Sequence, residues 1–256
     1  MKIAIDENIT LYLGDCLDVM PRLAAEGIKV ELVLTDPPYG TTHCRWDYVI
    51  PFAPMWDCVR SVSHDNTPAL LFCQQPFTST LGHSNLKELR YSWVWEKTQP
   101  TGFLNAKRMP MKAHEDILVF YRKLPKYNPV MTGGHTRKVV LAKHRHKCSP
   151  GTIYNGHGNY SDYSSTSRYP RSVLKYKTEK QTCCLHPTQK PVALLEYLIS
   201  TYTDEGDMVL DFAMGGGSTA IACRNTGRKF IGIEIDEHYF DVAESRIRKF
   251  LNGNGK

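Results

Sequence analysis

The sequence Asp36-Pro37-Pro38-Tyr39 combines, in four consecutive residues, the groups that hold a planar amine for reaction. Two consecutive prolines fix φ and remove two backbone N–H groups, so the carbonyls beside Asp36 have no competing local donor. An exocyclic amine has two hydrogens, which the Asp36 carboxylate and the Pro37 carbonyl would accept, turning the nitrogen lone pair toward an electrophile. Tyr39 supplies an aromatic face on which a base stacks. An ordinary turn is the alternative, but the apolar run before it favours a site.

A second group of residues, around the glycine-rich turn Gly215-Gly216-Gly217, is suited to hold a nucleoside. Residues 208–236 predict a strand, this turn, a helix and a second strand, an order in which glycines let the backbone approach a ligand closely. A carboxylate at the end of the second strand can bind ribose hydroxyls; Glu234 is favoured, and Asp236 is the alternative. A dinucleotide fingerprint, or glycines that only tighten a turn, would also fit the pattern.

Asp211, beside the glycine turn, helps to choose the ligand. A carboxylate at this position would repel a pyrophosphate, but it suits a ligand with a cationic amine. S-adenosylmethionine has such an amine, a sulfonium and no phosphate, so it is the favoured ligand.

Both sites need strands and helices to position them. Strands are predicted at residues 9–13, 30–35, 68–73, 91–96, 117–121, 208–212 and 229–235, and helices at residues 18–27, 52–63, 76–89, 192–202, 218–225 and 237–251. The alternation predicts an α/β fold. Because only one helix follows the glycine unit, the other strands of a nucleotide-binding sheet must come from earlier in the chain. The order of the two halves is therefore circularly permuted.

Positive charge is concentrated between residues 122 and 185. This stretch contains thirteen lysines and arginines against Asp162 and Glu179, a net charge of +11, which leaves −5 for the remainder of a chain whose total is +6. Glycine, serine and asparagine clusters predict a long loop here. A basic arm that binds a polyanion is the functional interpretation, and a solvated, disordered loop is the alternative. The basic face would be extended by Lys97, Lys107, Arg108 and Lys112, for which ordinary solvated side chains are the alternative.

Composition limits the class of protein. The 256 residues are 41% hydrophobic, enough for a core, and no stretch reaches the roughly 18 consecutive apolar residues of a membrane span. The first residues lack the features of a signal peptide, and eight scattered cysteines indicate free thiols, so we expect a cytoplasmic protein without membrane contact.

Six potential metal ligands cluster in and beside the basic stretch: His144, His146, Cys148, Cys183, Cys184 and His186. They lack the CxxC spacing typical of zinc sites, so we expect no metal.

Together these features resemble the site-specific DNA amino-methyltransferases of the beta-type, permuted architecture, in the branch that modifies adenine N6. Five segments carry the resemblance in the family's order: Gly14-Asp15-Cys16-Leu17, Asp36-Pro37-Pro38-Tyr39, His114-Glu115-Asp116-Ile117-Leu118-Val119-Phe120, His186-Pro187-Thr188-Gln189-Lys190-Pro191 and Asp211-Phe212-Ala213-Met214-Gly215-Gly216-Gly217-Ser218-Thr219. In this family, Asp rather than Ser before Pro-Pro favours adenine N6 over cytosine N4. The chain departs from the family at Phe212, Ala213 and Gly216, where proline, phenylalanine and serine are typical.

The resemblance implies a Rossmann-like, circularly permuted methyltransferase sheet with a loop-rich basic insertion. The catalytic half would span residues 1–121, the target-recognition insertion 122–185 and the cofactor-binding half 186–256. It implies direct transfer of a methyl group from S-adenosylmethionine to N6 of a flipped-out adenine in double-stranded DNA. It also implies a homodimer and a cognate restriction endonuclease as partners.

The resemblance, with the residue patterns above, assigns roles to three sets of residues. The catalytic set is Asp36, Pro37, Pro38 and Tyr39. The cofactor-binding set is Asp15, Cys16, Asp36, Thr188, Lys190, Asp211, Phe212, Ala213, Gly215, Gly217, Ser218, Thr219, Glu234 and Ile235. The DNA-binding set is Lys107, Arg108, Lys112, Arg137, Lys138, Lys143, Arg145, Lys147, Arg168 and Arg171. Methylation of cytosine N4, an RNA base or a protein amide, and a dinucleotide-dependent oxidoreductase, stay open as alternatives.

Overall fold

The computed structural model describes residues 1–41, 47–141, 162–178 and 189–253. The chain divides into two compact units, one of Met1–Asn128 with Ser172–Lys256 and the other of Pro129–Arg171. Among the described residues, no helix has the length and apolar character needed to cross a membrane.

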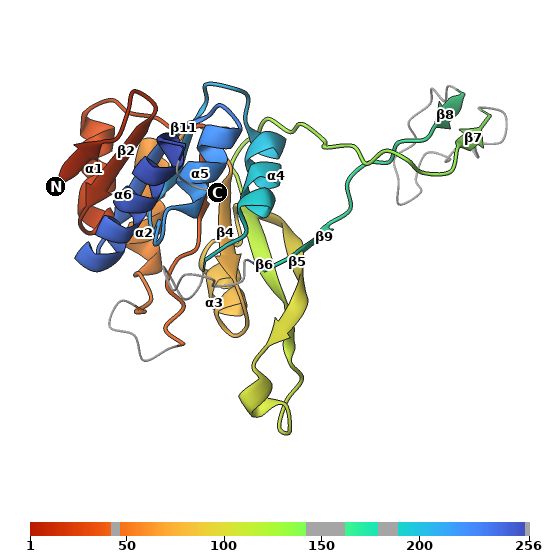
Figure 1. Ribbon diagram of the computed structural model, residues 1–256, viewed down its shortest axis with the longest axis horizontal. Coiled ribbons are helices and arrows are strands. Elements are labelled where there is room, and N and C mark those ends of the chain that lie inside the picture. Colours follow the sequence, from red (N-terminus) through yellow and green to blue (C-terminus); the bar gives the residue numbers. More distant parts are fainter. Residues whose placement is uncertain (42–46, 142–161, 179–188, 254–256) are drawn as a thin grey trace. The chain divides into compact units, whose positions relative to one another are not determined.

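The first unit is built on a nine-stranded mixed sheet (Figure 1). The strand order is β1 (Lys2–Ala4), β2 (Ile9–Leu13), β11 (Lys229–Glu234), β10 (Met208–Asp211), β3 (Leu32–Thr35), β4 (Ala69–Cys73), β6 (Lys112–Phe120), β5 (Leu89–Thr101) and β9 (Val173–Tyr176). The two strands of the glycine unit lie between β2 and β3, which come from the other end of the chain. The predicted permuted α/β order is therefore confirmed.

One edge of this sheet collects the carboxyl ends of five parallel strands, β2, β11, β10, β3 and β4. Strand β6 runs antiparallel to β4, so β6 begins at this edge, and its antiparallel neighbour β5 ends there. Ligands of open α/β sheets bind at the carboxyl ends of the strands. We call this side the carboxyl edge.

Helices cover both faces of the sheet. In the described part of the chain, the α-helices are α1 (Cys16–Ala25), α2 (Phe52–Val62), α3 (Phe77–Ser84), α4 (Val192–Tyr202), α5 (Ser218–Asn225) and α6 (Glu237–Leu251). Because successive side chains of a strand point to opposite faces, Leu32 and Leu34 pack into the core beneath α4, α5 and α6, while Val33 packs into the core beneath α1, α2 and α3. Burial on both faces explains why β3 is apolar throughout.

Most predicted elements are confirmed to within two residues, and three differ by five residues at one end: α3, β5 and β6, which begins at Lys112 instead of residue 117. Helix α3 ends at Ser84, before the predicted residue 89. Strand β5 extends to Thr101, beyond the predicted residue 96, because it continues to pair with β6 as a hairpin. Strand β9 was not predicted; its residues lie at the sheet's end, and only Leu174 among them is fully buried, so its apolar pattern is weak.

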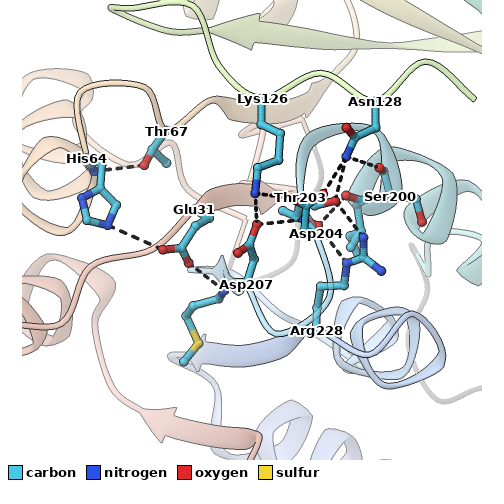
Figure 2. A network of polar contacts seen from close by, with 12 residues as sticks. Glu31, His64, Thr67, Lys126, Asn128, Ser200, Thr203, Asp204, Asp207 and Arg228 are labelled. Atoms are coloured by element: carbon cyan, nitrogen blue, oxygen red, sulfur yellow. Dashed lines mark hydrogen bonds and ion pairs between the residues drawn. The ribbon is translucent and has the colours of Figure 1, made fainter.

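A polar network holds the opposite edge of the sheet, where the strands of the glycine unit begin (Figure 2). Lys126 lies 2.7 Å from Asp204 and 2.8 Å from Asp207. The Asn128 side chain donates to the Thr203 carbonyl over 3.2 Å and to Asp204 over 3.1 Å. These contacts anchor the chain on the surface of the first unit just before it leaves for the second.

The second unit contains a short antiparallel pair, β7 (Lys138–Val140) with β8 (Tyr163–Ser165). Backbone hydrogen bonds between Thr132 and Arg168, of 3.0 and 2.8 Å, close the loop around this pair. The predicted insertion, 122–185, extends beyond this unit at both ends, since residues 122–128 and β9 belong to the first unit.

Candidate active site

A cavity of about 730 Å³ opens at the carboxyl edge of the sheet. It is lined by residues at the ends of β2, β3, β10 and β11, by the beginning of β6 and by the residues that precede α4. The candidate amine-binding and nucleoside-binding turns therefore open into one space, of a volume typical of small-molecule sites.

The Asp36-Pro37-Pro38-Tyr39 turn directly follows β3 and lines this cavity. The Tyr39 hydroxyl donates to one oxygen of the Asp36 carboxylate. One face of the Tyr39 ring stacks on Phe77 of α3, with 5.0 Å between ring centroids. The turn is thus held from the side of α3.

Asp47, which the sequence analysis did not single out, fixes the backbone that follows this turn. Its carboxylate accepts hydrogen bonds from the backbone N–H groups of Tyr39 and Gly40, both 2.8 Å, and of Thr41, 2.9 Å. The Asp47 side chain thereby satisfies three donors in a stretch without secondary structure. It holds the Asp36-Pro37-Pro38-Tyr39 turn in position.

Four alternating charges run from the turn into the sheet. The Lys190 ammonium donates to the second oxygen of the Asp36 carboxylate and lies 3.3 Å from Glu115 Oε2. Glu115 Oε1 lies 2.5 Å from the ammonium of Lys97. Lys97, Glu115 and Lys190 are each at most 9% exposed. Each charge in this order lies beside an opposite charge, which offsets part of the cost of burying it.

The pKa values of this chain of charges follow from burial and from the neighbouring groups. Burial alone would lower the pKa of Lys190, but the carboxylates of Asp36 and Glu115 outweigh it and raise that pKa. Burial opposes the ionised form of Glu115, yet Lys190 and Lys97 hold its pKa below the usual value. Burial raises the pKa of Asp36, and the charge of Glu115 adds to that rise, while Lys190 opposes it. Burial, reinforced by the Asp36 carboxylate, also raises the pKa of Tyr39 well above its usual value, so the hydroxyl keeps its proton.

The glycine turn joins β10 to α5. Gly217 has a left-handed φ of 74°, and a Cβ there would meet Ala243 Cβ at 3.3 Å and Ile247 Cδ1 at 3.1 Å on α6. Glycine at 217 therefore serves both the turn and close packing against α6. Gly215, with φ 49°, lines the cavity.

Asp211, at the end of β10, is bound by three donors. Its carboxylate accepts from the hydroxyl of Thr35 at 2.8 Å, from that of Thr219 at 2.6 Å and from the backbone N–H of Ala213 at 3.2 Å. Burial raises its pKa to about 6 despite these bonds. Asp211 thus ties β3, the strand that leads into the Asp36-Pro37-Pro38-Tyr39 turn, to the glycine turn.

Glu234 ends β11 on the same side of the cavity. One carboxylate oxygen accepts from Gly215 N at 2.9 Å, and the other accepts from Ile235 N and Asp236 N, both 3.0 Å. Oε2, which accepts only the bond from Gly215, keeps capacity for a further donor. Asp236 instead caps α6 through Tyr239 N, so Glu234 is the better placed of the two acids that the sequence offered.

Asp15 and Cys16 follow β2 and complete this side. Asp15 caps α1 by accepting from Leu17 N at 2.8 Å. Burial, together with the charge of Asp15, raises the pKa of the Cys16 thiol to about 12, so this cysteine is not a nucleophile at neutral pH. The other described cysteines, Cys58, Cys73 and Cys223, are also buried free thiols.

The cavity gathers most of the predicted cofactor-binding set. The residues that line it are Asp15, Cys16, Asp36, Lys190, Asp211, Phe212, Ala213, Gly215, Ser218, Thr219, Glu234 and Ile235. Gly217 packs on α6 instead, and Thr188 lies outside the described residues, as do the six clustered histidines and cysteines of the basic stretch. Phe212 is also buried in the core beneath α1, α2 and α3. It lies one position before Ala213, which replaces the phenylalanine typical of the family.

Sequence reasoning missed Asp47, Lys97 and Glu115 as parts of the site. Glu115 lies within one of the five segments that resemble the methyltransferase family. Its pairing with Lys190, however, depends on the order of the strands in the sheet. The interpretation of Lys97 as part of a basic surface is wrong, because Lys97 is buried against Glu115, above the Trp95 ring at 5.1 Å.

The predicted DNA-binding set divides among three places. Lys107, Arg108 and Lys112 are exposed on the hairpin that joins β5 to β6. Arg137, Lys138, Arg168 and Arg171 belong to the second unit, and Lys143, Arg145 and Lys147 lie outside the described residues. The guanidinium of Arg168 donates to the carbonyls of Thr136, Ser165 and Ser167, which gives it a structural role in that unit.

Comparison with known proteins bears on what this site does. The family model described as DNA methylase matches residues 30–245. The type II methyltransferase M.HpaI of Haemophilus parainfluenzae is 28% identical over 88% of this chain and 70% of its own length. The DNA adenine methyltransferase YhdJ of Escherichia coli (strain K12) is 25% identical over 94% of this chain and 83% of its own length. The crystal structure of the M1.HpyAVI–SAM complex superposes with a TM-score of 0.64 and 25% identity, covering 93% of this chain and 98% of that one.

Proposed function

Since the chain belongs to the DNA methylase family, we propose that it transfers the methyl group of S-adenosylmethionine to the exocyclic N6 of an adenine flipped out of DNA. The observation that carries this proposal is the shared cavity. The Asp36-Pro37-Pro38-Tyr39 turn and the glycine turn with Glu234 face one space at the carboxyl edge. An amine held at the first turn therefore lies beside a nucleoside held at the second, as a direct transfer requires.

The charges of the cavity fit a cationic cofactor. Its acidic lining residues are Asp15, Asp36, Asp47, Glu115, Asp211 and Glu234, and its basic ones are Lys97, Lys112 and Lys190. Lys97 and Lys190 are engaged by Glu115 and Asp36. A dinucleotide would bring its pyrophosphate to a turn flanked by Asp211 and Glu234, which disfavours the oxidoreductase alternative. S-adenosylmethionine supplies an electrophilic methyl group on a sulfonium.

In this mechanism the protein positions the two reactants, and the cofactor supplies the electrophile. Glu234 would accept from the ribose hydroxyls of the cofactor, and Asp15 lies on the same side of the cavity. Asp36 and the Pro37 carbonyl would accept the two amine hydrogens, and Tyr39, stacked on Phe77, would contact the base. The amine nitrogen would take the methyl group from the cofactor's sulfonium, which would become a thioether, and the proton that the amine loses would pass to solvent. Asp47 and Lys190 hold the turn and its carboxylate in place.

Adenine is favoured over cytosine by the residue before Pro-Pro. In the family that the chain resembles, Asp at this position is typical of adenine N6 and Ser of cytosine N4. A relative named as a DNA adenine methyltransferase supports the same assignment. Expression in a methylation-deficient host, followed by modification-sensitive sequencing, tests it. We expect N6-methyladenine at one sequence motif; N4-methylcytosine alone would refute the assignment.

Replacing the central carboxylate tests the role of the turn. We expect Asp36→Ala to reduce methyl transfer to DNA at least about 10³-fold, because the variant neither aligns the amine nor carries the local charge. Binding of S-adenosylmethionine, measured by calorimetry, should persist. Asp241→Ala, on the exposed side of α6, is the matched control and should keep full activity. Retained turnover of the Asp36 variant would contradict the assigned role.

Further partners rest on the family resemblance. The basic residues of the second unit would contact DNA phosphates, and a second copy of the chain and a cognate restriction endonuclease are the proposed protein partners. Sedimentation of the purified chain with and without DNA tests whether it binds a second copy of itself. A single species at the mass of one chain under both conditions would contradict the dimer.

A further inference from the structure

We propose that the tip of the β5–β6 hairpin, residues 102–111, is a wedge that enters duplex DNA beside the cavity. Leu104 and Phe103 would fill the space that the flipped adenine leaves in the base stack. This inference rests on the proposed function, because it assumes that a base leaves the duplex.

The tip exposes apolar side chains that the fold does not use. Leu104 is 97% exposed and Phe103 is 76% exposed, and Met109 nearby is 51% exposed. Neighbouring large apolar side chains with this exposure mark an interaction site rather than a core. In Figure 1 the hairpin runs out beyond the other strands of the first unit, with the tip at its far end.

The tip is ordered rather than a loose loop. Phe103–Asn105 form a 3-10 helix (η1), which Gly102 introduces with a left-handed φ of 90°. Backbone hydrogen bonds follow from Asn105 N to Gly102 O, 3.0 Å, and from Arg108 N to Asn105 O, 2.8 Å. The backbone that carries the two apolar side chains is therefore fixed, which reduces the entropic cost of insertion.

The charge around the tip fits a polyanion. Lys107, Arg108 and Lys112 are all exposed, and the sequence contains no acidic residue between Glu96 and Glu115. Two such tips would repel each other, so a second copy of the chain is the less favourable occupant. Apolar wedges flanked by basic residues suit duplex DNA, because the wedge unstacks bases while the cations contact phosphates.

The position of the hairpin links the wedge to the reaction. The part of the hairpin nearest its tip lines the same cavity as Asp36 and Tyr39, through Gln99, Pro100, Thr101, Gly102, Asn105 and Lys112. A duplex whose adenine enters the cavity must therefore pass close to the tip. The vacated position in the base stack would then lie within reach of Leu104.

A comparison of two DNA substrates tests the wedge, once sequencing has given the recognition motif. One substrate is the intact duplex, and the other carries an abasic site opposite the target adenine, which removes the base pair that flipping must break. We expect the double variant Phe103→Ala/Leu104→Ala to lower kcat/KM on the intact duplex by about tenfold or more. On the abasic duplex, we expect it to stay within about threefold of the wild type. Fluorescence of 2-aminopurine at the target should rise with the wild type and stay low with the variant.

Two controls separate the outcomes. Leu124→Ala removes another exposed leucine, 81% exposed, which follows β6 at the opposite edge of the sheet and should leave both rates unchanged. Unchanged binding of S-adenosylmethionine reports an intact fold. Equal losses on both substrates, no loss on either, or conversion of a dimer to monomers by the double variant would overturn the wedge. A wild type that methylates neither DNA would overturn the proposed function itself.

Discussion

Lys190 shows how the site depends on single contacts. Its ammonium lies between Asp36 and Glu115, and Glu115 Oε2 has no hydrogen bond among the described residues apart from its ion pair with this lysine. A buried carboxylate oxygen without a full partner is costly unless a charge offsets it. Glu115 therefore serves to hold Lys190 charged and close to the Asp36 carboxylate.

The pH dependence of turnover should reveal this coupling. Asp36 must be ionised to accept hydrogen bonds from both the amine and the Lys190 ammonium. We therefore expect activity to fall as pH decreases through the pKa of Asp36. Burial raises that pKa and the negative charge of Glu115 raises it further. Glu115→Gln removes the charge, so the acidic limb of the kcat/KM profile should move to lower pH. Glu96→Gln, a partly exposed glutamate paired with Lys175, is the control. An unmoved limb in the Glu115 variant would contradict the coupling.

The residues of the candidate site differ in how readily the sequence predicts them. Asp36-Pro37-Pro38-Tyr39 could be predicted because its groups are contiguous and follow an apolar run. The partnership of Lys190 with Glu115 could not, because it depends on β6 lying next to β4 with its first residues at the carboxyl edge. Asp47 was missed because its side chain acts on backbone N–H groups, which leave no residue pattern.

Among the elements, the β10–α5 turn shows where a glycine is required. Gly217→Ala would meet both a left-handed φ and Ala243 of α6. Gly27 has nearly the same φ, 75°, with no atom near a Cβ, so Gly27→Ala measures the backbone strain alone. We expect a loss of about 1–2 kcal/mol in the free energy of unfolding for Gly27→Ala. Gly217→Ala should lose about 1–3 kcal/mol more from overpacking. Urea denaturation measures both; equal losses would contradict the close packing.

Elements with a regular apolar period were predictable, and elements defined by pairing were not. The core strands and α4 could be predicted because burial on both faces leaves a continuous or periodic apolar run. The outer part of β5 and strand β9 carry exposed or polar residues, so only their neighbours in the sheet define them. The candidate wedge lies in this less predictable part, at the end of the hairpin.

At the scale of the molecule, the two edges of the sheet differ in where their charged side chains lie. The carboxyl edge holds the buried charges of the candidate site. The opposite edge holds ion pairs at the surface, in which Lys126 meets Asp204 and Asp207 (Figure 2). The charge of +11 on residues 122–185 is therefore not all available to a partner. Four of its basic residues, Arg122, Lys123, Lys126 and Lys175, pair with acids of the first unit.

The salt dependence of DNA binding should separate the two kinds of basic residue. Removing one cation that binds a phosphate lowers the slope of log K against log salt by about 1. Arg171 is exposed in the second unit, so Arg171→Ala should reduce both affinity and this slope. Lys123 lies 2.6 Å from Asp65, so Lys123→Ala should leave the slope unchanged. Fluorescence anisotropy across a potassium chloride series measures both. A wild-type slope for Arg171→Ala would contradict a phosphate contact by Arg171.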